Sequence, residues 1–475
     1  MQDVIIIGAG VIGTSIFREL TKYNGKVTMV DMENDVSVGT TKANSAIVHA
    51  GYDPKVGTLM AKLNLEGNIL FEDICAELKI SFKRNGSLVL AFSDEDMINI
   101  KKLYENGLLI GVTGLEIINK QKVLEMEPNV SKKVLGALYA KTGAIVSPYE
   151  YTIALAENGV ENGGEILLNS RVIKIEKDEN FKITLSSGEI LKSKYIVNAA
   201  GLYADKVHDL ICKKEFTIIP RKGEYYVLDK SQGRLFKHTL FQCPSKCGKG
   251  ILVTPTIHGN LIVGPNAVDI EDKEDLRTTA KALNNIKEAA LKTTDNINFR
   301  ESIRTFAGLR ATSDRGDFII EEAKDVKGFI DAAGMKSPGL SSAPAIALEV
   351  IKLLKDSGLK VQKNKDFKGS RKSVVFMELN DEEKNELIKK DSTYGRIICR
   401  CENITEGEII DAIHRSFGNI TVDGVKRRCR PGMGRCQGSF CGPKVQEIIA
   451  RELNKDMVEI CQEKEGSYIL VGRTK

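Results

Sequence analysis

Residues 1–31 show the hydrophobic pattern of a strand–helix–strand unit. Apolar residues run without a break from Val4 to Ile7, residues 11–23 have apolar positions at helical spacing, and residues 27–31 form a second apolar run that ends in an acid. A glycine-rich turn separates the first run from the helical segment. This order predicts a parallel sheet with a crossover helix at the start of the chain.

The hydrophobic pattern beyond residue 31 predicts further strands and three long helices. The helices are expected at residues 59–79, 272–293 and 343–355, the last two of them amphipathic. Strand-like runs lie at 86–92, 171–175, 182–185, 195–198, 224–228, 250–254 and 261–264. Strands and helices alternate early, whereas residues 216–264 are rich in strands. The fold class is therefore α/β, a Rossmann-like nucleotide-binding domain interleaved with a β-rich substrate domain, plus a small C-terminal module.

This pattern also suggests domain boundaries. Residues 1–360 are expected to form the two interleaved domains, and residues 361–395, rich in Lys, Asp, Glu and Ser, a linker. Residues 396–455 form a cysteine-rich module, and residues 456–475 a tail in which Ser467–Gly472 adds a strand. The nucleotide-binding segments are placed at about 1–80, 145–215 and 305–360, and the substrate domain at about 81–144 and 216–304.

Composition excludes several classes of protein. The 475 residues are 42% hydrophobic and 28% charged, as in ordinary globular proteins, and no apolar run approaches the roughly 20 residues that cross a bilayer. A net charge of +5 spread over mixed signs does not indicate nucleic-acid binding. Without a basic, cleavable leader at the start, we expect a cytoplasmic protein whose membrane contact, if it has one, is peripheral and made through a partner.

A dinucleotide-binding turn lies between the first predicted strand and helix. Gly8, Gly10 and Gly13 form G-x-G-x-x-G, in which the glycines allow the tight turn, the approach of a pyrophosphate and close helix–strand packing. Asp31, at the end of the second predicted strand, occupies the position of the acid that binds a ribose hydroxyl. The motif predicts FAD or NAD and does not distinguish them.

Six of the ten cysteines lie between Cys399 and Cys461. In a chain of this class, clustered cysteines indicate metal or redox chemistry rather than structural disulfides. Four of them form C-x-C, a gap of 34 residues and C-x₄-C: Cys399, Cys401, Cys436 and Cys441. Four thiolates can hold a 2Fe-2S cluster, and zinc stays open as an alternative although its ligand pairs are usually spaced C-x₂₋₄-C. Cys429, Cys243 and Cys247 are expected to be non-ligands.

Several segments resemble the D-amino-acid-oxidase-like FAD flavoproteins. Residues 40–51 are similar to that family's flavin-proximal segment, residues 198–205 to its second FAD-contacting turn, and residues 308–310 and 334–340 to its last FAD- and substrate-facing elements. The resemblance implies FAD, bound by the glycine turn, by Asp31 and by Thr40, Thr41, Asn44, Ser45, Val172, Ala200, Gly201, Gly334, Lys336, Ser337, Gly339 and Leu340.

The cysteine module resembles the bacterioferritin-associated-ferredoxin-like 2Fe-2S domain. The segments that carry the resemblance are Ile398–Glu402 and Gly432–Pro443. It implies a 2Fe-2S cluster held by Cys399, Cys401, Cys436 and Cys441. A flavin takes two electrons as a hydride and such a cluster carries one at a time, so the pair indicates a dehydrogenase that exports electrons.

Three side chains are candidates for the chemistry of substrate oxidation. His49 is the expected base, because imidazole has an ordinary pKa near ~6.5. Arg310 matches a substrate-anion arginine of related flavoproteins, and its guanidinium suits phosphate or carboxylate; its alternative is an ion pair with Asp314 or Asp317. Lys249, between two glycines, is expected to reach the anion as well. Arg221 and Lys222 are further anion candidates.

The layout most resembles anaerobic-type FAD-dependent glycerol-3-phosphate dehydrogenases. The resemblance implies oxidation of the small anion sn-glycerol 3-phosphate to dihydroxyacetone phosphate, with electrons leaving through the cluster to a partner flavoprotein or another acceptor. An L-2-hydroxyglutarate dehydrogenase, an amine or amino-acid dehydrogenase, and an electron-transfer subunit with a vestigial substrate site are the alternatives. A single strong arginine accompanied by lysines favours phosphate over a dicarboxylate.

Overall fold

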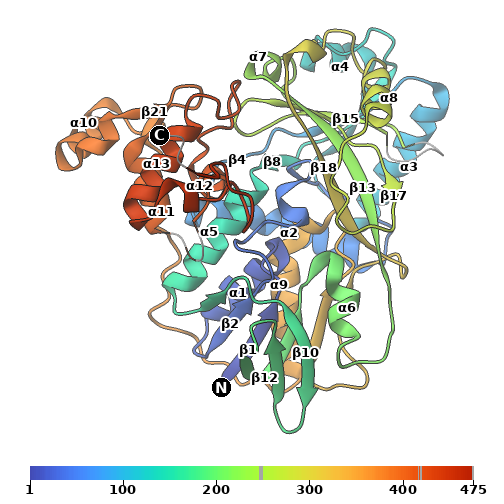
Figure 1. Ribbon diagram of the computed structural model, residues 1–475. Helices are drawn as coiled ribbons and strands as arrows, with labels where there is room; N and C mark the ends of the chain where they lie inside the picture. The colour runs from blue at the N-terminus through green and yellow to red at the C-terminus, as the bar shows by residue number, and fades with distance from the viewer. Residues whose placement is uncertain (245–249, 416, 418–419, 473–475) are drawn as a thin grey trace.

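The computed structural model describes residues 1–244, 250–415, 417 and 420–472. Three parts are visible in Figure 1: a layered α/β part around β1, α1 and α9, a sheet-rich part around β13, β15 and β18, and a helical module of α11, α12 and α13 at the side. The α/β architecture with a β-rich second part and a small C-terminal module is the fold class predicted from the sequence.

The α/β part is built on an eight-stranded sheet in which β1 lies between β12 and β2, parallel to both. Helices α1, α5 and α9 pack with α2 over one face, around Ile6, Phe17 and Ile346. The sheet runs β10-β11-β12-β1-β2-β9, with β20 beside β12 and β19 beside β20. Its strands are β1 (Gln2–Ile7), β2 (Val27–Val30), β9 (Glu165–Leu167), β10 (Val172–Lys177), β11 (Phe181–Leu185), β12 (Ile190–Asn198), β19 (Ile319–Glu322) and β20 (Phe329–Ala333). Its helices are α1 (Val11–Thr21), α2 (Leu59–Glu77), α5 (Pro148–Glu161), α6 (Ala204–His208) and α9 (Gly339–Asp356).

The second part is a nine-stranded sheet with a separate apolar core. Its two longest strands, β13 (Ile218–Leu228) and β18 (Ser302–Ser313), pair antiparallel along their length, which sets Arg310 directly opposite Arg221. The other strands are β5 (Ser87–Ala91), β6 (Leu115–Asn119), β7 (Gly136–Ala140), β14 (Thr239–Gln242), β15 (Leu252–Pro255), β16 (Leu261–Gly264) and β17 (Val268–Asp269). Helices α3 (Asp94–Ile110), α4 (Lys120–Met126), α7 (Lys230–Gly233) and α8 (Ala280–Ala290) accompany it, and β3 (Ile47–Val48), β8 (Ala144–Val146) and β4 (Phe82–Lys83) form a small sheet between the parts.

Two of the predicted helices are confirmed and one is shorter than predicted. Residues 59–79 contain α2, and residues 343–355 lie within α9. The prediction of one helix over 272–293 is wrong, because α8 begins only after Thr279, whose hydroxyl accepts the N–H of Ala282 as a helix cap. The residues before this cap are held in other contacts: Asp275 binds the buried amine of Lys222, and Glu224 accepts the N–H of Thr279.

The C-terminal module contains β21 (Ile397–Cys399), β22 (Ile404–Thr405), α11 (Glu406–His414), α12 (Val422–Cys429) and α13 (Gly442–Leu453) around its own core. The stretch 361–395 is not featureless, since it holds α10 (Asp381–Lys390), closed at its start by an Asn380–Glu383 capping box. The strand predicted at Ser467–Gly472 is wrong: only a single bridge pairs Tyr468 with Cys461. Among the described residues, no helix has both the length and the apolar character needed to cross a membrane.

Candidate functional site

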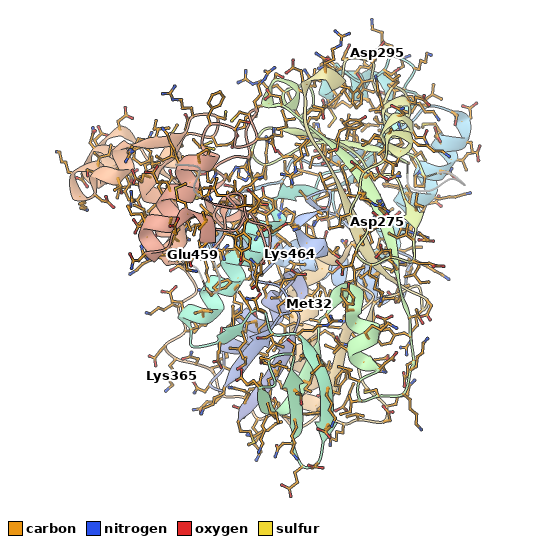
Figure 2. The ribbon with its side chains drawn as sticks, viewed as in Figure 1. Met32, Asp275, Asp295, Lys365, Glu459 and Lys464 are labelled. Atoms are coloured by element: carbon orange, nitrogen blue, oxygen red, sulfur yellow. The ribbon has the colours of Figure 1, made fainter. Side chains whose placement is uncertain are left out.

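A long groove runs from the glycine turn to the face of the second sheet. Its lining includes Gly8 and Asp31, residues Thr40 and Thr41 of the 3₁₀ turn Thr40–Lys42, and the side chains of His49 and Arg310. Met32, which also lines it, is labelled near the middle of Figure 2. The groove thus connects the edge of the α/β sheet, where nucleotides bind in such folds, to the side chains predicted to do chemistry.

The glycine turn has the geometry that a dinucleotide needs. Gly8 has a φ of +110° and a Cβ there would lie 2.4 Å from the carbonyl oxygen of Ala199, while a Cβ on Gly13 would lie 1.8 Å from the carbonyl oxygen of Gly8. Gly10 is open, since its added Cβ would meet only Thr41 Oγ1, at 3.3 Å. Gly8 and Gly13 therefore permit close packing, and Gly10 leaves backbone exposed at the start of α1, where phosphate is favoured.

Asp31 lies at the end of β2 with both carboxylate oxygens engaged by backbone. Oδ2 accepts the N–H of Ala9 at 2.6 Å, and Oδ1 accepts the N–H of Glu33 at 2.8 Å. Burial raises the pKa of Asp31 to about 6 although these two hydrogen bonds act in the opposite direction. A carboxylate has about four lone-pair positions, so Asp31 keeps room for ribose hydroxyls.

The segment after the 3₁₀ turn forms one wall of the groove through its own hydrogen bonds. Thr41 Oγ1 accepts the N–H of Val11 at 3.0 Å, and Asn44 Oδ1 accepts the N–H of Ala46 at 2.8 Å. Ser45 Oγ lies 3.3 Å from the hydroxyl of Tyr225 on β13, so this wall touches the second sheet. The segment is fixed to both halves of the groove.

His49 is held in place from several sides. Its N–H donates to Ser341 Oγ at 2.7 Å, its ring Nε2 lies 3.2 Å from Ser337 Oγ, and the ring stacks on Phe241 at a centroid distance of 5.8 Å. Among the described residues, the other four histidines do not line the groove; each instead lies beside a carboxylate, in the pairs His208–Asp331, His238–Glu127, His258–Glu150 and His414–Glu452. His49 is therefore the imidazole positioned to face a ligand.

Arg310 lines the same groove and makes no ion pair among the described residues. Its Nη1 donates to the carbonyl oxygen of Arg221 at 3.4 Å. The two aspartates considered as its alternative partners are used elsewhere: Asp314 accepts the N–H of Thr217, and Asp317 accepts the N–H groups of Leu59 and Met60.

Two further predicted cations, Arg221 and Lys222, do not line the groove. Arg221 makes a two-pronged ion pair with Asp269, at 2.5 and 2.8 Å, and Lys222 pairs with Asp275 at 3.0 Å. Lys249 lies outside the described residues, so its place near the anion stays a prediction.

Most of the residues predicted to contact FAD line the groove. These are Gly8, Gly10, Asp31, Thr40, Thr41, Asn44, Ser45, Ala200, Gly201, Lys336, Ser337, Gly339 and Leu340. Gly13, Val172 and Gly334 do not line it. Gly13 acts through packing, Val172 begins the strand β10 towards the edge of the sheet, and Gly334 turns with a φ of +72° against Ser313.

Three side chains that contact Ser45 or His49 were not predicted from the sequence. Tyr225 lines the groove beside Ser45, Phe241 stacks on His49, and Ser341 receives the His49 N–H. In a strand over residues 224–228 the two adjacent tyrosines must lie on opposite faces, and this alternation is the signal that could have pointed to Tyr225. Nothing comparable marks Phe241 or Ser341, because their positions depend on contacts between distant segments.

The four clustered thiols of the C-terminal module form two pairs. Cys401 Sγ lies 3.8 Å from Cys436 Sγ, and Cys399 is hydrogen-bonded to Cys441. That bond from Cys441 lowers the pKa of Cys399, helped by the backbone N–H groups of Gly432, Glu402 and Cys401. In the part of the chain that the structure describes, no three Cys, His, Asp or Glu side chains converge as for a single ion. Two thiols at each of two points fit a binuclear cluster with two irons better than one zinc.

The remaining described cysteines lie apart from these pairs. Cys429 Sγ donates to the carbonyl oxygen of Val425 inside the helical core, and Cys243 Sγ donates to the carbonyl oxygen of Asp96. Cys75 and Cys212 are buried in the cores of the α/β part, and Cys461 pairs by backbone with Tyr468. Cys247 lies outside the described residues.

Buried ion pairs fasten the cluster module to the groove-forming part. Asp35, which is 3% exposed, accepts from Arg428 at 2.7 Å and from Arg427 at 3.0 Å. These two arginines lower the pKa of Asp35 against the effect of its burial. Glu463 of the tail joins Arg427 at 3.0 Å to Lys42, at 2.5 Å, on the 3₁₀ turn of the groove. The module therefore contacts the segment that lines the groove.

Two stretches of the chain match known protein families. Residues 3–353 match the family "FAD dependent oxidoreductase", and residues 397–451 match the "BFD-like [2Fe-2S] binding domain". FAD and a 2Fe-2S cluster are therefore the cofactors, as predicted, and the groove and the paired thiols are the places in this structure that fit them.

Known proteins resemble the chain over different lengths. A glycerol 3-phosphate dehydrogenase of Caloramator mitchellensis is 57% identical over 100% of this chain and 99% of its own. A glycerol 3-phosphate oxidase of Mycoplasma genitalium is 35% identical over 74% of this chain and 94% of its own. The dithionite-reduced L-α-glycerophosphate oxidase of Mycoplasma pneumoniae with FAD bound superposes with a TM-score of 0.75 at 30% identity, covering 78% of this chain and 99% of that one.

Proposed function

Because this chain belongs to the FAD dependent oxidoreductase family, we propose that it oxidises sn-glycerol 3-phosphate to dihydroxyacetone phosphate and passes the electrons through its 2Fe-2S cluster to a partner acceptor. The observation that carries the proposal is the presence of His49 and Arg310 in the lining of one groove, one able to take a proton and the other to hold an anion. The name carried by the relative that matches over the whole chain supports this substrate.

His49 is assigned as the base that takes the proton of the C2 hydroxyl. An imidazole is suited to this near neutral pH, and stacking on Phe241 together with the contact to Ser337 fixes the ring. FAD, when bound, accepts the hydride from C2, so that the alcohol loses one proton and one hydride and becomes the ketone.

Arg310 is assigned to the phosphate. Its guanidinium has no carboxylate partner among the described residues and lines the groove, so it is available for a charge-assisted pair with an anion. A dicarboxylate such as 2-hydroxyglutarate would favour two free arginines, whereas Arg221 is paired with Asp269. This difference favours the phosphate over the alternative 2-hydroxy acid. Lys249 remains a candidate second cation.

The cluster is assigned as the exit for electrons. The oxidase of Mycoplasma genitalium aligns over 74% of this chain yet 94% of its own length, so this chain has a stretch that the oxidase lacks, and the cluster domain occupies residues 397–451. A cluster that carries single electrons suits transfer to a redox partner, whereas a flavin transfers electrons to oxygen without one. A partner flavoprotein is one acceptor of this kind.

The test is anaerobic reduction of the purified protein by sn-glycerol 3-phosphate, followed through the flavin absorbance. We expect rapid bleaching with this compound and none with L-2-hydroxyglutarate or amino acids. If the flavin is reduced by dithionite but not by glycerol 3-phosphate, the substrate assignment is wrong. If the flavin bleaches while the cluster stays oxidised in electron paramagnetic resonance, the proposed exit is wrong.

A further inference from the structure

A second cavity, of about 430 Å³, lies at the junction between the cluster module and the other two parts. Its wall combines Phe306 and Thr256 of the second part, Tyr149 of the α/β part, and Lys426 and Met433 of the cluster module. We call it the junction cavity. Its volume falls in the range of pockets that hold drug-sized ligands, and it is separate from the groove assigned to FAD.

The junction cavity lies between the two redox sites. Ala43 and Asn44 line both the cavity and the FAD groove, so the two spaces share one wall. The ring of Phe306 in the cavity stacks on the ring of Tyr225 in the groove at 4.5 Å and an angle of 5°. On its other side the cavity is lined by Gln437, the neighbour of the cluster cysteine Cys436 in the chain.

Two cations face the cavity without adequate counter-charge. Lys426 has 15% of its side chain exposed, and the carboxylate within ion-pair distance is that of Asp423 at a long 3.7 Å. Arg304 is exposed and has no ion pair among the described residues. Burial lowers the pKa of Lys426, and the positive charge of Arg304 lowers it further. The nearby Lys42, Arg427 and Arg430, by contrast, each have a carboxylate at 3.1 Å or less.

The remainder of the lining suits a flat apolar body with hydrogen-bonding groups at its edge. Phe306, Ile257 and Ile262 supply apolar surface, while Thr256 and Asn260 supply polar groups. One face of the Phe306 ring is already covered by Tyr225, so this aromatic wall is fixed before a ligand enters. An aromatic and apolar wall beside two under-compensated cations is complementary to a ring that carries a phosphate.

We propose that the junction cavity binds a mononucleotide, with its ring against Phe306 and its phosphate between Lys426 and Arg304. This site goes beyond the oxidation of glycerol phosphate, which uses the groove of His49 and Arg310. A ring bound here would contact Ala43 and Asn44, which also line the groove, and would lie near Gln437, the chain neighbour of the cluster cysteine Cys436.

The experiment measures binding to protein that is already saturated with FAD and loaded with its cluster. Flavin mononucleotide and riboflavin form one pair of probes, and AMP and adenosine the other, with bound compound quantified by chromatography after ultrafiltration. We expect at least one phosphorylated probe to bind saturably at one per chain, about tenfold or more tightly than its phosphate-free counterpart. Which of the two phosphorylated probes binds identifies the ring.

The matched variants separate the phosphate contact from folding. In Lys426→Met with Arg304→Met, the phosphorylated probe should bind no better than its counterpart, while FAD content and cluster absorbance stay at the parent values. Lys444→Met, an exposed lysine of the same module that does not line the cavity, should leave the preference intact. The proposal is overturned if neither phosphorylated probe binds, or if the double variant keeps the preference for phosphate.

Discussion

The Nε2 atom of His49 lies 3.2 Å from the hydroxyl of Ser337, across 288 positions of the chain. The contact joins the flavin-proximal segment to the loop that leads into α9, and both line the groove. The Ser337 hydroxyl can donate a hydrogen bond to Nε2 when this nitrogen carries no proton and can accept one from it when it does. The contact therefore persists in both protonation states of the ring.

His49→Asn should slow flavin reduction by sn-glycerol 3-phosphate by about 10²–10⁴, the usual contribution of a general base. Anaerobic stopped-flow absorbance measures the rate. Ser337→Ala serves as the milder companion, with an expected decrease of less than about tenfold. A full rate in His49→Asn would remove the histidine from the mechanism.

Arg310→Met should raise the KM for glycerol 3-phosphate by about ten- to a hundredfold, since a hydrogen bond to a charged group contributes about 1.5–3 kcal/mol. Steady-state rates with an artificial electron acceptor give the value. Arg221→Met is the matched control, because Arg221 lies directly opposite Arg310 on the neighbouring strand but is committed to Asp269. Equal effects of the two changes would contradict the phosphate assignment.

Cys401→Ser should abolish the 2Fe-2S cluster while anaerobic bleaching of the flavin by substrate persists. The Cys401 thiol pairs with Cys436, and loss of one ligand leaves an iron with too few thiolates. Iron content and electron paramagnetic resonance report on the cluster. Cys429→Ala should keep a full complement of iron, because Cys429 bonds to Val425 within the helical core. Iron loss in this control would make Cys429 a ligand.

The affinity of the apoprotein for FAD should fall about tenfold between pH 7 and pH 5. Burial raises the pKa of Asp31 to about 6, so the carboxyl is protonated below that value, whereas ribose hydroxyls donate to the ionised form. Binding therefore releases a proton, and acid opposes it. Fluorescence titration at each pH measures the affinity. The Asp31→Asn variant should bind FAD more weakly at pH 7, and its affinity should no longer depend on pH. If the affinity of the variant still falls between pH 7 and pH 5, the pH dependence belongs to Glu33, Asp35 or another group.

Asp35→Asn should lower the free energy of unfolding by about 3–5 kcal/mol, because it leaves the buried arginines Arg427 and Arg428 without their shared carboxylate. Denaturant titration measures the loss. Electron transfer from the flavin to the cluster should slow as well, since this ion pair fastens the cluster module. Asp178→Asn, which removes an exposed pair with Lys182, should produce no measurable change in either quantity.

Features encoded by neighbouring residues could be predicted from the sequence. The glycine turn, the acid at the end of β2 and the four cysteines are each contained in short segments, and the structure places Gly10 and Asp31 in one groove and the thiols in two pairs. The start of α8 was misplaced because apolar spacing continues before Thr279, while Lys222 and Glu224 on a distant strand draw residues 275–279 into other contacts.

Features that depend on the pairing of distant strands could not be predicted in this way. A family resemblance favours Arg310 over Arg221 as an anion ligand, but Arg221 stays a candidate in the sequence, and only the pairing of β13 with β17 shows that Asp269 is within reach of Arg221. The stacking of Phe306 on Tyr225 likewise arises from the register of β13 against β18, and the contact of Phe241 with His49 joins β14 to the residue that follows β3 in another sheet.

The contact between Lys42 and Glu463 spans 421 positions, which has a consequence for biosynthesis. At about 5–20 residues per second, a ribosome adds Glu463 roughly 20–80 s after Lys42 has been made. During that interval the groove-forming part can fold, but Lys42 of its 3₁₀ turn cannot yet form its ion pair with Glu463. The turn is therefore not yet joined to Arg427. A segment of the groove that is translated early is thus completed only by a residue that lies 421 positions later in the chain.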